Sequence, residues 1–381
     1  MKRFLTIILM TIFVLVTVIG CTDIQNPPPT QPPQMMENGQ PPEAEAKRED
    51  VLGADKRVVM AFYTDGEGEI PSSKESMLKN AKIIDEISFF WYSFDGKGNV
   101  VPTGEVNLSL KDAAQKNKAK AYAVVHNLTK DGFDANLAHK VLANPTARNN
   151  LVQSLVKLTT KDGWDGIAVD IEKTPPGDRD NYSAFVNDLH KALKAKDKIL
   201  NVSIPAKFVD YPSDLWSGAY DYAAIGKGAD QVVLMTYDEH GTGTTHGPIA
   251  SHDWVDRVIN YAVEQIPKEK IVMGLPVYSF DWGTDKPTKP AYLTYNQSLE
   301  QAKKHGVEVF YDGAEQVPHY HYTASGIRHE VYLENSKSLG KKLEYAKGHE
   351  LHGVAIWRLG MEDPSLWDKV LKTYGTNQNK K

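Results

Sequence analysis

Eight short runs of β-branched and other apolar residues limit what this chain can fold into more than any other feature. They recur from Arg57 onward, and each has the length of one buried β-strand. Segments with helical spacing separate many of them, such as the one with Leu151, Leu155 and Leu158. Eight alternations of strand and helix predict an α/β fold, a closed parallel (β/α)8 barrel, although an open doubly wound sheet would also alternate. The runs are residues 57–63, 86–92, 119–126, 166–171, 198–205, 231–236, 270–277 and 352–357.

The interval between the seventh and eighth runs is much longer than the others. It spans residues 278–351 and contains a polar, aromatic segment at 311–332, which is too long for one helix to account for the connection. Long connections inside compact domains tend to have structure of their own. We therefore expect a small α+β insertion at about 280–337, followed by a helix over 337–346, within one barrel domain that spans 53–375.

The first 20 residues have the layout of a secretory signal: two basic residues, an apolar stretch from Phe4 to Ile19, and then Gly20-Cys21. The position of Cys21 resembles a bacterial lipoprotein processing site. We expect a signal peptide over 1–21 and a lipid anchor on Cys21, with the protein exported and held at the membrane. The alternative is an uncleaved anchor helix, but this stretch of 16 residues is short for a span of about 20.

Residues 22–52 are rich in Pro, Gln, Asn and Glu and contain almost no large apolar side chain. Such a segment cannot bury enough surface to offset the entropy lost on ordering, so we expect a disordered, semi-extended tether. It would hold the folded domain away from the membrane.

Charge and cysteine content exclude several kinds of partner and bond. The net charge is −5 and the basic residues are scattered, so we expect no nucleic-acid partner. Cys21 is the single cysteine, which excludes a disulfide within the chain. We expect a monomer.

Two acidic residues, Asp170 and Glu172, lie at and just after the end of the fourth run, within the segment GWDGIAVDIE at 163–172. Successive side chains of a strand point to opposite faces, so the isoleucines and the valine share one face, and Ala168, Asp170 and Glu172 share the other. The apolar face should contact the helices, which directs two carboxyl groups into the barrel interior. Charge there is costly without partners. A purely structural pair, bonded to neighbouring Lys, Tyr or backbone groups, is the alternative.

Glu172 lies at the carboxyl end of this strand, where barrel enzymes build their sites. Residues two apart on one face are about 6.6 Å apart along the strand, close enough for Asp170 to raise the pKa of Glu172. A glutamic acid that stays protonated near neutral pH can donate a proton to a glycosidic oxygen. The pattern therefore favours Glu172 as a general acid.

The motif Asp165-Gly166-x-x-x-Asp170-x-Glu172 resembles the signature of glycoside hydrolase family 18, most closely that of its bacterial spore-germination and cortex-lytic branch. The resemblance implies that Glu172 protonates the leaving oxygen and that Asp170 orients the substrate's acetamido group. That group, rather than an enzyme carboxylate, is the nucleophile in this family. One departure is Ala168, where chitinases of the family usually have another Asp. The resemblance implies no cofactor and no metal.

Further matches extend the resemblance from about Arg57 to Trp367. At the end of the sixth run, it implies that Tyr237 hydrogen-bonds the acetamido carbonyl and that Met235 and Asp238 line the sugar site. Trp357, after the eighth run, would form the floor beneath the sugar, because a flat indole suits the apolar faces of sugars. Packing of these side chains on the barrel rim is the alternative. Tyr63 and Tyr278, at the ends of the first and seventh runs, also resemble positions around the cleft.

Two groups of histidines could suggest a metal site. His240, His246 and His252 follow the sixth run, and a second group spans 319–329. Their spacing matches no regular ligand pair, so we interpret both groups as solvated or substrate-lining loops rather than metal ligands.

Three functions remain compatible with the sequence. The first is a retaining glycosidase that cleaves β-linked N-acetylglucosamine in peptidoglycan, of spore cortex or cell wall. The second is a chitinase or an endo-β-N-acetylglucosaminidase that acts on other glycans with the same residues. The third is a carbohydrate-binding barrel without activity, which the presence of Glu172 disfavours.

Overall fold

The computed structural model describes residues 57–285 and 289–375. The predicted signal peptide, Cys21 and the predicted tether lie outside the described residues. The export and the lipid anchoring of the protein therefore stay predictions.

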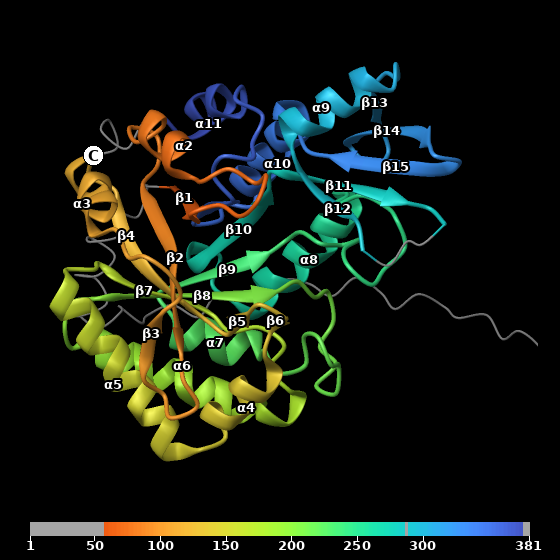
Figure 1. Ribbon diagram of the computed structural model, residues 1–381. Helices are drawn as coiled ribbons and strands as arrows, with labels where there is room; N and C mark the ends of the chain where they lie inside the picture. The colour runs from red at the N-terminus through yellow and green to blue at the C-terminus, as the bar shows by residue number, and fades with distance from the viewer. Residues whose placement is uncertain (1–56, 286–288, 376–381) are drawn as a thin grey trace, which may run out of the picture. The chain divides into compact units, whose positions relative to one another are not determined.

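Eight parallel strands close into a barrel (Figure 1). Strand β1 pairs in parallel with both β2 and β16, which joins the two ends of the sheet and excludes an open doubly wound arrangement. The predicted barrel is thus confirmed, with strand ends within two residues of those expected. Its strands are β1 (Val58–Tyr63), β2 (Glu86–Phe94), β4 (Lys120–His126), β7 (Gly166–Asp170), β8 (Ile199–Pro205), β9 (Gln231–Met235), β10 (Ile271–Pro276) and β16 (Gly353–Trp357).

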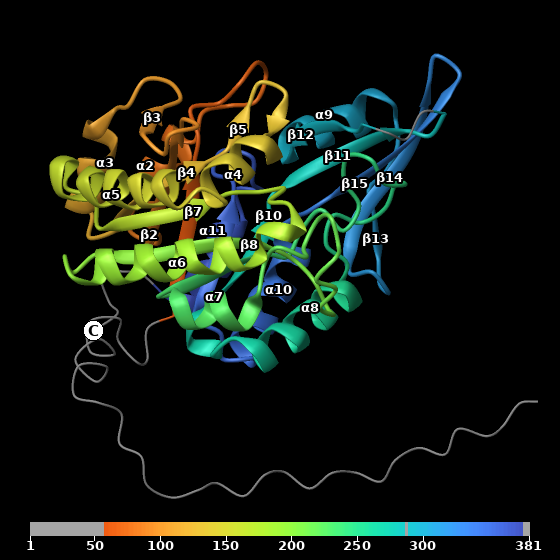
Figure 2. The ribbon, with the colours of Figure 1, turned by 90° about the horizontal axis from the view of Figure 1, so that it is seen from below.

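Helices cover the outer face of the barrel. Figure 2 shows β7 between α5 and α6, and the same outer layer continues around the other strands. None of the described helices has both the length and the apolar character needed to cross a bilayer. The helices outside the insertion are α2 (Lys74–Lys79), α3 (Leu108–Lys116), α4 (Ala135–Leu142), α5 (Pro145–Asp162), α6 (Arg179–Lys194), α7 (Tyr222–Gly228), α8 (His252–Gln265), α10 (Ser336–Gly348) and α11 (Leu366–Tyr374).

Local sequence signals set the ends of α5, which leads into the acidic strand. The Asn144 side chain accepts hydrogen bonds from the backbone N–H groups of Thr146 (3.0 Å) and Ala147 (3.1 Å), and Pro145 occupies the first helical turn. Gly163 ends the helix with a φ of 69°, a conformation that glycine adopts without steric cost. The chain then turns back to enter β7.

The alternation of each strand divides the core into two layers. Outward side chains such as Ile167, Val169 and Ile171 pack with the helices in the larger layer. Inward side chains fill the lumen, namely Val58, Met60, Phe62, Tyr122, Val124, Ala168, Val233, Val272 and Ala355. This confirms that the apolar face of β7 contacts the helices and that its other face points into the barrel.

The connection from β10 to α10 contains an antiparallel sheet beside the barrel (Figure 1). Its strand order is β12-β11-β15-β14-β13, and its own small core includes Tyr320, Tyr322 and Val331. The predicted α+β insertion is thereby confirmed. Its elements are β11 (Tyr278–Gly283), β12 (Ala291–Thr294), α9 (Tyr295–Lys304), β13 (Phe310–Asp312), β14 (Val317–Ala324) and β15 (Ile327–Leu333). Three short strands lie elsewhere: β3 (Val100–Pro102), β5 (Leu128–Thr129) and β6 (Gly132–Phe133).

Candidate active site

The first part of the acidic motif fixes the start of β7. One Asp165 carboxylate oxygen accepts hydrogen bonds from the backbone N–H of Ala121 (2.9 Å) and from the side chain of Gln115 (2.8 Å). At Gly166, a Cβ atom would lie 2.2 Å from the carbonyl oxygen of Ile199 on β8, so only glycine allows the two strands to approach this closely. These two residues position the strand rather than perform chemistry.

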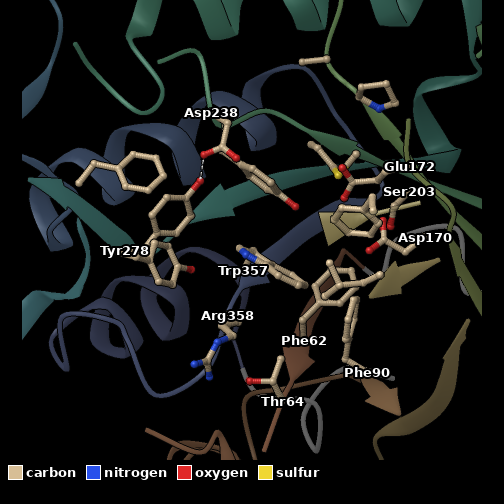
Figure 3. A pocket seen from close by; sticks show the side chains of 18 of the residues that line it. Phe62, Thr64, Phe90, Asp170, Glu172, Ser203, Asp238, Tyr278, Trp357 and Arg358 are labelled. Carbon is tan, nitrogen blue, oxygen red and sulfur yellow. Dashed lines mark hydrogen bonds between the residues drawn. The ribbon is translucent and has the colours of Figure 1, made fainter. Parts of the chain in front are cut away.

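A cavity of about 640 Å³ opens at the carboxyl ends of the barrel strands. Figure 3 shows Asp170, Glu172 and Ser203 on one side of it, Asp238 with Tyr278 on the other, and Trp357 between them. All the predicted catalytic and sugar-binding residues except Tyr63 line this cavity: Asp170, Glu172, Met235, Tyr237, Asp238, Tyr278 and Trp357. The structure therefore brings together side chains from β7, β9, β11 and β16 and from the segments that follow β7 and β9.

Glu172 is held through its backbone. Asn127, fully buried after β4, accepts a hydrogen bond from the Glu172 N–H (2.9 Å) and donates one to the Glu172 carbonyl oxygen (2.8 Å). This two-point contact fixes the direction in which the Glu172 side chain leaves the strand end. Sequence reasoning missed Asn127, because a single amide after a strand gives no pattern.

The electrostatics of the cavity favour a protonated Glu172. Burial raises the pKa of Glu172 well above its usual range, and the negative charges of Asp170 and Asp238 raise it further. Burial also raises the pKa of Asp170, to about 7. Asp170 is 4% exposed, and its Oδ1 has no hydrogen-bond partner among the described residues. The cavity thus holds a carboxyl group able to donate a proton at neutral pH, beside a second one with a free acceptor oxygen.

On the opposite side, Tyr278 donates a hydrogen bond from its hydroxyl to Asp238, whose backbone φ of 59° turns the chain sharply after β9. The Tyr237 and Tyr278 rings meet edge to face at 6.4 Å between centroids. Burial raises the pKa of Tyr237 well above its usual range, so Tyr237 keeps its hydroxyl proton and can donate a hydrogen bond to a ligand.

Trp357 is supported by two other aromatic rings. Phe62 and Phe90 contact it edge to face, at centroid distances of 5.2 and 5.7 Å. The peptide bond between Trp357 and Arg358 is cis. Because Trp357 is only partly buried and lines the cavity, one part of the indole remains available to a ligand.

Tyr63 does not line the cavity that holds Glu172. Alternation along β1 turns Phe62 into the lumen and Tyr63 outward, where its ring packs against Phe89 and Trp91. Its hydroxyl donates to Asp65 (3.2 Å) and borders a neighbouring groove of about 780 Å³. Phe62, which sequence reasoning missed, is the residue of β1 that faces the cavity, and the alternation of Val58, Met60 and Phe62 is the signal that could have found it.

The histidines that could have suggested a metal site do not converge. His240 contacts the Pro248 carbonyl oxygen (3.0 Å), and His252 contacts its neighbour Asp253 (3.3 Å). In the insertion, His329 pairs with Asp281 (2.8 Å) and stacks on a tyrosine. Within residues 57–285 and 289–375, no group of three or more His, Cys, Asp or Glu residues is arranged to hold a metal ion.

Comparison with known proteins shows the family of this chain. A family model described as "Glycosyl hydrolases family 18" matches residues 58–362. The chain belongs to glycoside hydrolase family 18. It is 31% identical over 329 residues to "Uncharacterized glycosylase YvbX" of Bacillus subtilis, covering 83% of this chain and 95% of that one. It is 27% identical over 312 residues to the cortical fragment-lytic enzyme of Bacillus cereus, covering 79% and 71%.

A solved structure agrees with these relatives. The chitinase from Chromobacterium violaceum superposes with a TM-score of 0.77 at 30% identity, covering 83% of this chain and 98% of that one. This family 18 protein is therefore a glycoside hydrolase with the barrel of its family.

Gly274 of β10 gives a direct test of how Tyr237 is positioned. A Cβ atom at Gly274 would lie 2.6 Å from the Leu234 carbonyl oxygen and 2.7 Å from Cε1 of Tyr237. We expect Gly274→Ala to displace the Tyr237 ring and to lower kcat about 10-fold or more, since misplacement by about 1 Å can cost 10²-fold. Steady-state kinetics on a soluble oligosaccharide measures this effect.

The matched control is Gly340→Ala in α10, where the new Cβ atom would meet only the Lys369 side chain at 3.7 Å. It should keep full activity. Wild-type kcat in Gly274→Ala would contradict the role given to Tyr237.

Proposed function

We propose that this glycoside hydrolase is a retaining, substrate-assisted enzyme that cleaves β-linked N-acetylglucosamine in peptidoglycan, of spore cortex or cell wall. The observation that carries the proposal is the pair of carboxyl groups at the end of β7, in which the half-buried Glu172 has a strongly raised pKa beside the free acceptor oxygen of the buried Asp170. One carboxyl group can donate a proton, and the other can accept a hydrogen bond from an acetamido N–H.

In the first step, Glu172 gives its proton to the oxygen that bridges the two sugars. The carbonyl oxygen of the substrate's acetamido group attacks the anomeric carbon, the bond to the bridging oxygen breaks, and the leaving sugar departs with the proton. The cyclic intermediate is an oxazolinium ion. Asp170 accepts from the acetamido N–H and Tyr237 donates to the carbonyl oxygen, which holds this group in the attacking geometry.

In the second step, the Glu172 carboxylate removes a proton from a water molecule, which attacks the anomeric carbon from the side that the leaving group vacated. The ring of the intermediate opens and the acetamido group is restored. Two inversions at one carbon retain the configuration, and Glu172 ends protonated as it began. Trp357 supports the sugar throughout.

Peptidoglycan is favoured as substrate by the relatives and by the sequence. The relatives include a protein named cortical fragment-lytic enzyme. An exported, lipid-anchored protein on a tether would also meet a wall polymer. Chitin is the second candidate, because the solved structure at 30% identity is named a chitinase. Digesting defined muropeptides and chitooligosaccharides side by side, with mass analysis of the products, distinguishes the two.

A thiazoline analogue of the cyclised intermediate should inhibit competitively and bind at least about 10²-fold more tightly than the substrate. It copies the bicyclic shape that the cavity would stabilise, and analogues of that kind exceed substrate affinity by 10²-fold or more. Initial rates at several substrate concentrations give the inhibition constant. If the thiazoline does not inhibit the enzyme although the enzyme cleaves the glycan, the acetamido group is not the nucleophile.

A further inference from the structure

The loop between β8 and α7 is unusually apolar for a solvent-facing segment. Large hydrophobic side chains are exposed at eleven positions in the described residues, and five of these lie between 208 and 216. Leu215 is 81% exposed, Tyr211 63% and Trp216 48%. Surface patches of this kind mark binding sites more often than scattered apolar residues do.

This loop is fixed rather than loosely attached. The Arg179 guanidinium donates to both carboxylate oxygens of Asp210, at 3.2 and 2.8 Å, and Lys207 donates to the same carboxylate at 2.7 Å. Nearer the tip, Asp214 accepts a hydrogen bond from the Trp216 backbone N–H (3.1 Å). The apolar side chains are therefore presented by an ordered backbone, which lowers the entropy lost when a ligand binds.

Trp216 also lines the cavity that holds Glu172, as do Pro205, the last residue of β8, and Ala206, which follows it. Strand β8 is the neighbour of β7, whose end carries Glu172, whereas Trp357 lies in the middle of the cavity (Figure 3). A proton donor must lie between the reacting sugar and the leaving group. If the reacting sugar rests on Trp357, the leaving group extends past Glu172 toward Trp216.

The chemistry of the loop fits a sugar. Its charged residues Lys207 and Asp210 are paired with each other and with Arg179, and Asp214 is used within the turn. The one cation of residues 207–216, Lys207, is thus paired, and Asp214 is an anion, so the loop does not favour an anionic lipid headgroup or a polyanion. An indole and its apolar neighbours suit the C–H faces of a pyranose.

We propose that Trp216 is the binding platform for the sugar unit on the leaving-group side of the cleaved bond, with Tyr211 and Leu215 extending it outward. This proposal rests on the proposed function. The same platform would hold an incoming sugar. A hydroxyl oxygen of this incoming sugar then bonds to the anomeric carbon of the oxazolinium ion, and the hydroxyl proton passes to the Glu172 carboxylate. The bond between the anomeric carbon and the acetamido oxygen breaks. Transfer to a sugar would thus compete with hydrolysis.

Two substrates distinguish an effect on sugar binding at Trp216 from an effect on the rest of the site. Glycan strands freed from peptidoglycan by an amidase carry a sugar leaving group, whereas the preformed oxazoline of N,N′-diacetylchitobiose has no leaving group. In the full-length protein, Trp216→Ala should lower kcat/KM on the glycan strands about 10- to 50-fold and leave oxazoline hydrolysis within about twofold of wild type. It should also reduce transfer to an added acceptor sugar. Trp216→Phe should restore part of both effects.

The matched control is Phe310→Ala in the insertion, because Phe310 is 54% exposed and does not line the cavity. It should change neither reaction. Equal activity of Trp216→Ala and wild type on glycan strands, or equal losses on both substrates, would overturn the platform. So would a wild-type dimer that Trp216→Ala converts to monomers with cleavage unaffected, since the loop would then join two copies. A wild-type protein that cleaves neither substrate would instead remove the proposed function.

Discussion

Replacing Glu172 with Gln should lower kcat for glycan cleavage about 10²- to 10⁴-fold while leaving substrate affinity nearly unchanged. The pKa of Glu172 is raised well above its usual range, so the wild-type side chain is neutral in the free protein, and Gln replaces it with a neutral group of the same shape. Only the proton is lost. Release of reducing ends gives kcat, and calorimetric titration with an oligosaccharide gives the affinity.

The matched control is Glu300→Gln on α9, an exposed glutamate outside the cavity lining, which should retain wild-type activity. The loss in Glu172→Gln should be smaller for an aryl glycoside whose phenol leaves without protonation. A variant that stays within about threefold of wild type on the glycan would exclude Glu172 as the acid.

Asp170→Asn should lower kcat about 10²-fold and at the same time stabilise the protein at alkaline pH. Burial raises the pKa of Asp170 to about 7 in the folded protein, against an ordinary value near 3.8. Below pH 3.8 this carboxyl group is protonated in both the folded and the unfolded protein, so its raised pKa does not reduce the free energy of unfolding. As the pH rises toward 7, the unfolded state releases its proton more readily, so the folded state loses stability relative to it.

The direction of this pH dependence can be measured by thermal unfolding. Thermal unfolding at pH 4 should give nearly equal Tm values for Asp170→Asn and wild type, and at pH 8 the variant should melt a few degrees higher. Asn removes the buried charge at 170, and the pKa of Glu172 falls toward its usual range as a result, which adds to the gain. A variant that melts lower at both pH values would show that Asp170 supports the fold, contrary to its placement in the cavity.

The barrel could be predicted from the sequence because its strands and helices each leave a local pattern of apolar residues along the chain. A strand buried on both faces reads as a short apolar run, and all eight runs form the expected strands. The insertion was predicted from its length alone. Its strand pairing was not, because pairing depends on contacts between residues far apart, such as the one that sets Phe280 of β11 opposite Tyr332 of β15.

The candidate site was predicted where a motif falls on a strand end, as at Asp170, Glu172 and Trp357. Tyr63 shows the limit of that reasoning, because one residue of displacement along β1 moves a side chain from the lumen to the outer layer. Trp216 lines the cavity from a loop and Tyr292 from the short strand β12, and neither segment carries a pattern in the sequence that pointed to these residues. Ser203 could have been found, since it shares the inward face of β8 with Asn201.

The continuity of β10 with β11 bears on how the specificity of such enzymes could be redesigned. Only Val277 separates the last residue of β10 from Tyr278, the first residue of β11, whose hydroxyl is bonded to Asp238. The α+β insertion therefore cannot be exchanged as a unit at the boundary between β10 and β11. A chimera that takes its insertion from a relative should keep the host chain through Phe280, which also lines the cavity, and place the junction beyond it.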